Sequence, residues 1–120
     1  MIEDHTIVRK GLKLLLESDP QIEVVGEAAN RAQAFEIATQ HKPNLFLVDL
    51  LLGQDVASDF LKELLAVSSG ARAVLHTGVT DGEHVRRAID AGATGLVYKD
   101  EVCEVLLRAI QKVQDRKSVV

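Results

Sequence analysis

Apolar residues occur at two spacings that alternate along the chain. Over residues 5–18 they recur every three or four positions, which predicts an amphipathic helix, and Pro20 marks its end. Residues 22–28 follow as a short run rich in β-branched side chains, which predicts a strand. The first part of the chain therefore has the pattern of a helix followed by a strand.

The next pair of elements is bounded by strong local signals. Asn30 followed three residues later by Gln33 is typical of a capped helix start, and Pro43 stops this helix after residue 42. Residues 45–48 are all apolar without alternation, as is typical of a strand covered on both faces of a parallel sheet. A polar loop over residues 54–58 is expected before the following helix.

The second half of the chain repeats the alternation. It predicts a helix around residues 60–65, a strand over 73–77, a helix from the capping pair Thr80 and Glu83 to Gly92, a strand over 95–99 and a helix over 102–113. Strands that alternate with helices in this way form β-α units with parallel strands. We therefore expect an α/β fold, a doubly wound parallel sheet, in one domain over residues 1–120.

Composition narrows the classes of function. The 120 residues are 47% hydrophobic and 27% charged with a net charge of −4, as in ordinary folded domains. Three Phe, one Tyr and no Trp, without a basic excess, argue against direct binding of nucleic acid. The single cysteine, Cys103, cannot form an internal disulfide, which favours a reducing compartment and a cytoplasmic location, and Cys103 itself is expected to be a small buried hydrophobe. No apolar run reaches the roughly 18 residues of a membrane span, so no membrane partner is expected.

Polar residues stand where the predicted strands end. Glu3 and Asp4 precede the first helix, Asp49 follows residues 45–48, and Thr77 and Lys99 close the two later strands. Ligands of open parallel sheets bind beyond these carboxyl ends. Three crowded carboxylates repel one another and usually hold a hard divalent cation, for which Mg²⁺ fits best. Lys99 and the Thr77 hydroxyl could then neutralise the oxygens of a phosphoryl group, and an exposed carboxylate could attack its phosphorus atom.

Four short motifs at these strand ends together resemble a known family. They are Glu-Asp-His at 3–5, Val-Asp-Leu at 48–50, His-Thr-Gly at 76–78 and Tyr-Lys-Asp at 98–100. As a set they resemble the receiver domain of two-component response regulators, over essentially the whole chain and with the same order of β and α elements. The resemblance implies a flavodoxin-like receiver fold and a signalling role.

The resemblance also implies a role for each site residue. Asp49 is expected to accept phosphate from the phosphohistidine of a sensor histidine kinase. Mg²⁺ is expected on Asp4 directly, on Glu3 through water, on Asp49 and on the backbone carbonyl oxygen of Leu51. Thr77 is expected to move toward the phosphoryl group, and Lys99 to pair with it.

The expected consequence of phosphorylation is a shift of the surface around residues 78–112 that controls an output domain or partner. The phrases Val-Arg-Lys-Gly-Leu at 8–12 and Val-Val-Gly-Glu-Ala at 24–28 resemble the subclass that precedes helix-turn-helix DNA-binding domains. Contact with DNA is therefore expected only through an output domain outside this chain. The resemblance also implies that the last helix, with the preceding strand and helix, forms a surface for homodimerisation.

Two other functions remain open from the sequence. A small phosphohydrolase could use the same aspartyl phosphate. Such enzymes need a second carboxylate as acid and base two residues after the nucleophile, where this chain has Leu51. A receiver-like interaction domain without phosphorylation is the other alternative. His5 and His76 flank the site but lack zinc spacing, so they are interpreted as hydrogen-bonded neighbours and not as ligands.

The residues before the acidic pair raise one further expectation. By the resemblance, a strand of about five residues should precede Glu3 and lie in the middle of the sheet. Only Met1 and Ile2 stand there. We therefore expect a first strand that is truncated or missing, with an unusual or oligomeric arrangement at this end of the sheet.

Overall fold

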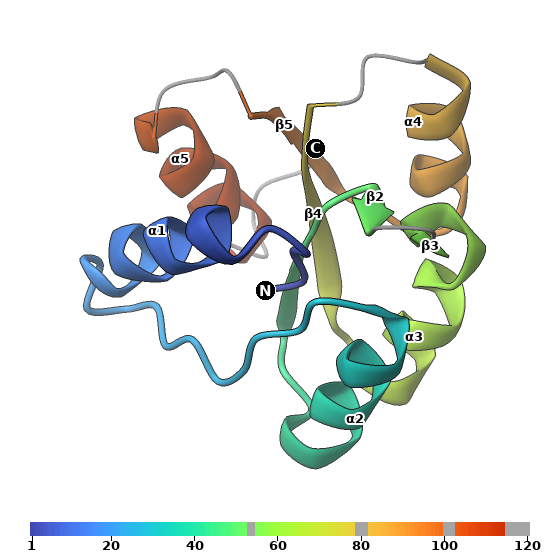
Figure 1. Ribbon diagram of the computed structural model, residues 1–120, viewed down its shortest axis with the longest axis horizontal. Helices are drawn as coiled ribbons and strands as arrows, with labels where there is room; N and C mark the ends of the chain where they lie inside the picture. The colour runs from blue at the N-terminus through green and yellow to red at the C-terminus, as the bar shows by residue number, and fades with distance from the viewer. Residues whose placement is uncertain (53–54, 79–81, 100–102, 115–120) are drawn as a thin grey trace.

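The fold is a central parallel sheet with helices on both faces (Figure 1). The computed structural model describes residues 1–52, 55–78, 82–99 and 103–114. One face carries α1 (Thr6–Glu17) and α5 (Cys103–Gln114), and the other carries α2 (Arg31–His41), α3 (Leu61–Val67) and α4 (Gly82–Asp90). The expected α/β fold with a doubly wound sheet is confirmed.

The three longer strands run parallel and in register. They are β1 (Leu45–Val48), β4 (Arg72–Thr77) and β5 (Gly95–Tyr98), in the spatial order β1-β4-β5. Val48 of β1 lies opposite Leu75, and Thr77 lies opposite Tyr98. Because the strands are parallel, their carboxyl ends meet at one edge of the sheet.

Alternating side chains of these strands build two separate cores. Phe46, Val48 and Leu75 are buried in a cluster with residues of α2, α3 and α4. Leu47 and Val74, which point to the opposite face, are buried with residues of α1 and α5. Strand residues are therefore apolar at successive positions because both faces of the sheet are covered.

Ile2 occupies the place of a further strand beside β1. It forms parallel bridges with Ala28 on one side and Val48 on the other. The Ile2 N–H donates to the Leu47 carbonyl oxygen at 2.7 Å, and the Asp49 N–H donates to the Ile2 carbonyl oxygen at 2.9 Å. Within this chain, one bridging residue holds the central position expected for the first strand; an oligomeric arrangement at this end of the sheet stays a prediction.

The strand predicted over residues 22–28 is wrong. In this segment only Ala28 forms a β-bridge, and residues 22–27 run without strand pairing. A β-rich composition becomes a strand only where a neighbour supplies backbone partners. The neighbour here is Ile2 with its flanking residues, which pair with Ala28 and, through the Met1 amine, contact the Gly26 carbonyl oxygen at 3.4 Å.

A small hairpin stands where a polar loop was expected after β1. β2 (Leu51–Leu52) and β3 (Asp55–Val56) pair in antiparallel fashion, with Leu51 opposite Val56, and the 3₁₀ turn η1 (Ala57–Asp59) follows. Residues 53–54, between the two strands, lie outside the described part of the chain. The hairpin begins at Leu51, two residues after Asp49.

Two helix-start predictions have different outcomes. The N–H of Gln33 donates to Asn30 Oδ1 at 2.9 Å, and Gln33 Oε1 accepts from the Ala29 N–H at 2.9 Å, so the predicted cap of α2 is confirmed. Thr80 of the second capping pair lies outside the described residues, and so does the side chain of Cys103. Within the described residues, no helix has the length and apolar character needed to cross a membrane.

Candidate functional site

Four of the predicted site residues follow or end neighbouring strands at one edge of the sheet. Asp4 comes two residues after the Ile2 bridge, Asp49 directly follows β1, Thr77 ends β4 and Lys99 directly follows β5. The Lys99 N–H donates to the Thr77 carbonyl oxygen at 2.9 Å, which continues the pairing of β4 and β5 by one step. Parallel pairing thus brings these residues together from four separate parts of the sequence.

The ammonium group of Lys99 lies between two carboxylates. Its Nζ is 2.8 Å from Asp49 Oδ2 and 2.9 Å from Glu3 Oε2. The Glu3 and Asp49 side chains are 2% and 5% exposed, whereas that of Lys99 is 24% exposed. Lys99 therefore supplies a countercharge to both of these buried carboxylates.

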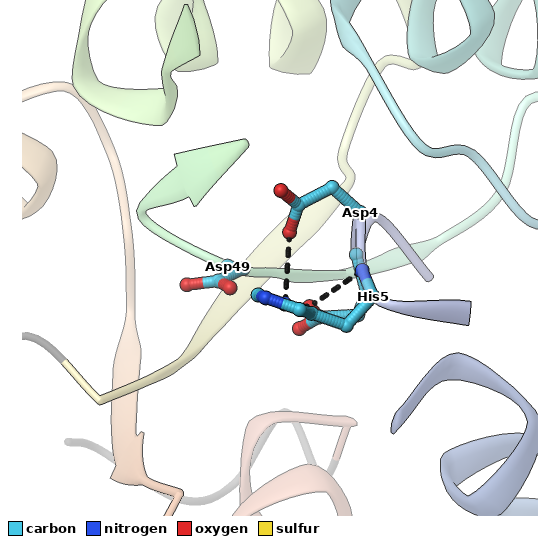
Figure 2. A group of neighbouring side chains, drawn as sticks. Asp4, His5 and Asp49 are labelled. Atoms are coloured by element: carbon cyan, nitrogen blue, oxygen red, sulfur yellow. Dashed lines mark hydrogen bonds and ion pairs between the residues drawn. The ribbon is translucent and has the colours of Figure 1, made fainter. Parts of the chain in front are cut away.

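His5 contacts both members of the acidic pair, Glu3 and Asp4. Its backbone N–H and its Nδ1 lie 3.2 and 2.8 Å from Glu3 Oε1, and Nδ1 is 3.1 Å from Asp4 Oδ1. Figure 2 shows the side chains of Asp4, His5 and Asp49 next to one another. His5 is thus a hydrogen-bonded neighbour of the carboxylates, as the sequence favoured.

Arg9 is a residue of the site that the sequence analysis missed. Its Nη1 donates to the backbone carbonyl oxygen of Glu3 at 2.9 Å, and its Nε lies 3.8 Å from Glu27 Oε1. Arg9 therefore fixes the backbone that carries the acidic pair. In the sequence, Arg9 is only a basic residue six positions after an acidic one. This spacing is too common to identify Arg9 as part of a site.

Burial and ion pairing act in opposite directions on the pKa values of Glu3, Asp49 and Lys99. Burial raises the pKa of Asp49, Lys99 lowers it in part, and the charge of Glu3 raises it further, so that the pKa stays above its usual value. Burial also acts to raise the pKa of Glu3, but hydrogen bonds from Lys99 and His5 outweigh it and lower that pKa. Burial disfavours the charged form of Lys99, but the two carboxylates outweigh this effect and raise its pKa.

The carboxylates outnumber the cationic groups around them. Ligand atoms of Glu3, Asp4, His5 and Asp49 all lie within 4.8 Å of one another. Hydrogen bonding to Glu3 and the charges of Asp4 and Glu3 raise the pKa of His5, as expected beside excess negative charge. Carboxylate oxygens at this density, with partial exposure of Asp4, suit a hard divalent cation such as Mg²⁺.

Leu51 and Thr77 lie at the margin of this cluster. The Leu51 N–H is 3.4 Å from Asp49 Oδ1, so the backbone of β2 contacts the Asp49 carboxylate directly. Thr77 is fully buried at the end of β4, the strand next to β1. These placements agree with the neighbourhood expected from the sequence, whereas the chemical roles of both residues stay predictions.

The sequence pattern of the response regulator receiver domain matches residues 1–111. The chain belongs to the response regulator receiver domain family. The predicted family is therefore confirmed, and this receiver domain is a signalling domain of two-component response regulators, not a classical enzyme.

Individual relatives agree with this assignment. The chain is 33% identical over 120 residues to the DNA-binding transcriptional activator DevR/DosR of Mycobacterium tuberculosis. The match covers 100% of this chain and 55% of the relative. That name fits the predicted resemblance to receivers that precede DNA-binding domains. The chain spans about half the length of the curated relatives it matches.

Two solved structures share the fold. A LuxR-family two-component response regulator from Aurantimonas is 28% identical with a TM-score of 0.86, and the match covers 93% of this chain and 80% of that one. A response regulator from Burkholderia pseudomallei, solved with a phosphorylated aspartic acid, a calcium ion and citrate, is 25% identical with a TM-score of 0.81. That second match covers 99% of this chain and 73% of the other.

Proposed function

We propose that this receiver domain accepts a phosphoryl group on Asp49 from the phosphohistidine of a sensor histidine kinase. The observation that carries the proposal is the position of Asp49, whose Oδ2 lies 2.8 Å from Lys99 Nζ inside a cluster of acidic ligand atoms. The phosphorylated aspartic acid of the Burkholderia relative supports it. In the transfer, an oxygen of Asp49 forms the new P–O bond, and the P–N bond breaks with its electron pair returning to the kinase imidazole.

The residues around Asp49 suit this reaction. The Leu51 N–H approaches one carboxylate oxygen and Lys99 approaches the other, so the carboxylate has a fixed orientation. After transfer, the Lys99 ammonium can pair with the phosphoryl oxygens. We infer that the Thr77 hydroxyl then moves toward the same oxygens and that this movement shifts the surface around residues 78–112.

The donor set fits a Mg²⁺ ion. Asp4, Asp49 and the backbone carbonyl oxygen of Leu51 would hold it directly, and Glu3 through water. When bound, the ion neutralises charge on the phosphoryl oxygens. One divalent cation within reach of the three carboxylates would offset their mutual repulsion further.

The side chain of Leu51 bears on how fast a phosphoryl group on Asp49 would be lost. The residue two positions after Asp49 is Leu51, whose side chain cannot act as acid or base, so we expect slow loss of the phosphoryl group at most and no phosphohydrolase turnover. We propose a cytoplasmic location, a kinase as the phosphate source, control of DNA binding only through an output domain, and the capacity to form a homodimer.

A labelling experiment tests the proposal. Acetyl phosphate with Mg²⁺ should add one phosphoryl group to the wild-type chain, seen by intact-protein mass spectrometry, and none to Asp49→Asn. Asp90→Asn, at an exposed position of α4, is the matched control and should be labelled like the wild type. Equal labelling of Asp49→Asn and the wild type would mean that another residue is the acceptor.

A further inference from the structure

Arg9 lies in the first turn of α1 and reaches back to the backbone of the acidic pair. Its Nη1 donates to the Glu3 carbonyl oxygen at 2.9 Å, and its side chain is 20% exposed. Among the described residues, no backbone N–H donates to this oxygen. The Arg9 guanidinium group therefore supplies the hydrogen bond that the Glu3 carbonyl group does not receive from the sheet.

The Glu3 backbone is held at both of its polar groups. Its N–H donates to the Ala28 carbonyl oxygen at 2.9 Å, and its carbonyl oxygen accepts from Arg9. Because a peptide group is planar, fixing the Glu3 carbonyl oxygen also fixes the Cα atoms of Glu3 and Asp4. These two residues carry the carboxylates of the acidic pair. The contact with Arg9 thus acts on both side chains at the point where they leave the backbone.

Glu27 in turn holds the guanidinium group of Arg9. Glu27 Oε1 lies 3.8 Å from Arg9 Nε, and Glu27 Oε2 lies 3.8 Å from Nζ of Lys13, one turn further along α1. Glu27 directly precedes Ala28, so one short segment supplies both the partner of the Glu3 N–H and the countercharge of Arg9. Arginine suits this position because its planar fork can meet two oxygen acceptors in fixed directions.

Arg9 acts in two opposite ways on a cation near the acidic pair. Its guanidinium group cannot be deprotonated in a protein, and its positive charge repels a second cation. Its hydrogen bond to Glu3, in contrast, keeps the two carboxylates oriented. The ion pair with Glu27 offsets part of the charge and leaves the hydrogen bond intact. We therefore expect orientation to outweigh repulsion.

We propose, building on the cation site of the proposed function, that Arg9 is a positioning residue of that site. Through the Glu3 carbonyl oxygen it orients the Glu3 and Asp4 carboxylates and so raises the affinity of the site for Mg²⁺. Arg9 itself carries no ligand atom. Replacing a residue that orients metal ligands typically weakens metal binding about 10- to 100-fold. Arg9 holds the backbone and not a ligand atom, so the lower end of this range is expected.

Calorimetric titration of the whole chain with Mg²⁺ at fixed ionic strength tests the inference. Arg9→Met removes the hydrogen bond to Glu3 and should raise the Kd about tenfold. Lys13→Met is the matched control, because it removes the same charge from the same partner, Glu27, and leaves the hydrogen bond to Glu3 in place. Its Kd should stay within about twofold of the wild type. Loss of a positive charge alone would tighten cation binding, so weaker binding by Arg9→Met cannot come from the charge.

Arg9→Lys covers the case in which Arg9→Met does not fold. It keeps the charge but loses the planar fork, so its Kd should also rise, by about threefold or more. Circular dichroism establishes which variants are folded at the temperature of the titration.

The outcomes separate this inference from the proposed function. Wild-type affinity or tighter binding by Arg9→Met, or by Arg9→Lys where Arg9→Met is unfolded, would overturn the role of Arg9 alone. An equal rise of the Kd in Lys13→Met would do the same. No saturable binding by the wild type, or wild-type affinity in Asp4→Asn, would instead overturn the cation site of the proposed function, and the role of Arg9 with it.

Discussion

Lys99 controls the charge balance of the site at the scale of single residues. Its ammonium contacts Glu3 and Asp49, both almost fully buried, and no other lysine or arginine within the described part of the chain forms an ion pair with either of them. An unpaired buried carboxylate costs free energy because it loses its hydration. The pairing therefore bears on folding as well as on the proposed phosphorylation of Asp49.

Substitution of Lys99 by Met should lower the free energy of unfolding. Met has a similar length but cannot donate, so both carboxylates lose a charged hydrogen bond. We expect a loss of about 2 kcal/mol at pH 7 in urea denaturation with EDTA present. Lys62→Met, at an exposed position of α3, should change stability by no more than about 0.5 kcal/mol.

The effect of Lys99→Met should also depend on pH. The pKa of Glu3 is lowered in the folded wild type, so its pairing stabilises the fold above the unfolded value of 4.5 and is lost as pH falls through the folded pKa. The raised pKa of Asp49 contributes in the opposite sense, since its ionisation costs stability as pH rises through that pKa. The gap between wild type and Lys99→Met should therefore shrink on acidification. A constant gap from neutral to acidic pH would contradict this account.

The sequence predicted which residues meet in the site but not all of their contacts. Asp49, Thr77 and Lys99 could be placed together because parallel strands bring their carboxyl ends to one edge. The contacts of His5 and Arg9 could not, because they depend on the short turn between Asp4 and α1, where Arg9 reaches back to the Glu3 backbone. Such geometry has no spacing that distinguishes it in a sequence.

Among the elements, α2 shows how a local signal becomes stability. The Asn30 side chain accepts the N–H of Gln33, one of the N–H groups that a helix start leaves without a partner. Asn30→Ala should therefore lower the free energy of unfolding by about 1 kcal/mol in urea denaturation. Gln40→Ala, at an exposed position of the same helix, should have a smaller effect. Equal effects of the two substitutions would show that the cap contributes nothing of its own.

The elements that the sequence predicted wrongly share a physical cause. The cap of α2 involves residues close in the chain, so the local sequence pattern is sufficient to predict it. The segment over residues 22–28 needs a partner strand, and Ile2 supplies one only at Ala28. The pairing of Leu51 with Val56 likewise depends on which backbone groups meet. The polar sequence between the two residues does not predict that pairing.

At the scale of the whole molecule, the two buried clusters hold the sheet from both faces and leave the acidic residues at one edge. Phe46 and Leu47 of β1 belong to different clusters, so the strand before Asp49 is fixed by α2, α3 and α4 on one face and by α1 and α5 on the other. The acidic cluster is therefore built on a rigid support. The remaining repulsion among its carboxylates is offset by Lys99 and His5.

Binding of a divalent cation should accordingly stabilise the whole domain. Mg²⁺ would bind the folded state and relieve repulsion among the carboxylates, and a ligand at about 100 times its Kd stabilises by about 2.7 kcal/mol. We expect a rise in Tm of several degrees in thermal unfolding followed by circular dichroism. The rise should largely disappear in Asp4→Asn and persist in Asp90→Asn, whose side chain is exposed on α4. NaCl at matched ionic strength separates ion binding from general screening, since exposed charges respond to both. The same rise in Asp4→Asn, or with NaCl alone, would mean that the acidic cluster does not bind the cation of the proposed phosphoryl transfer.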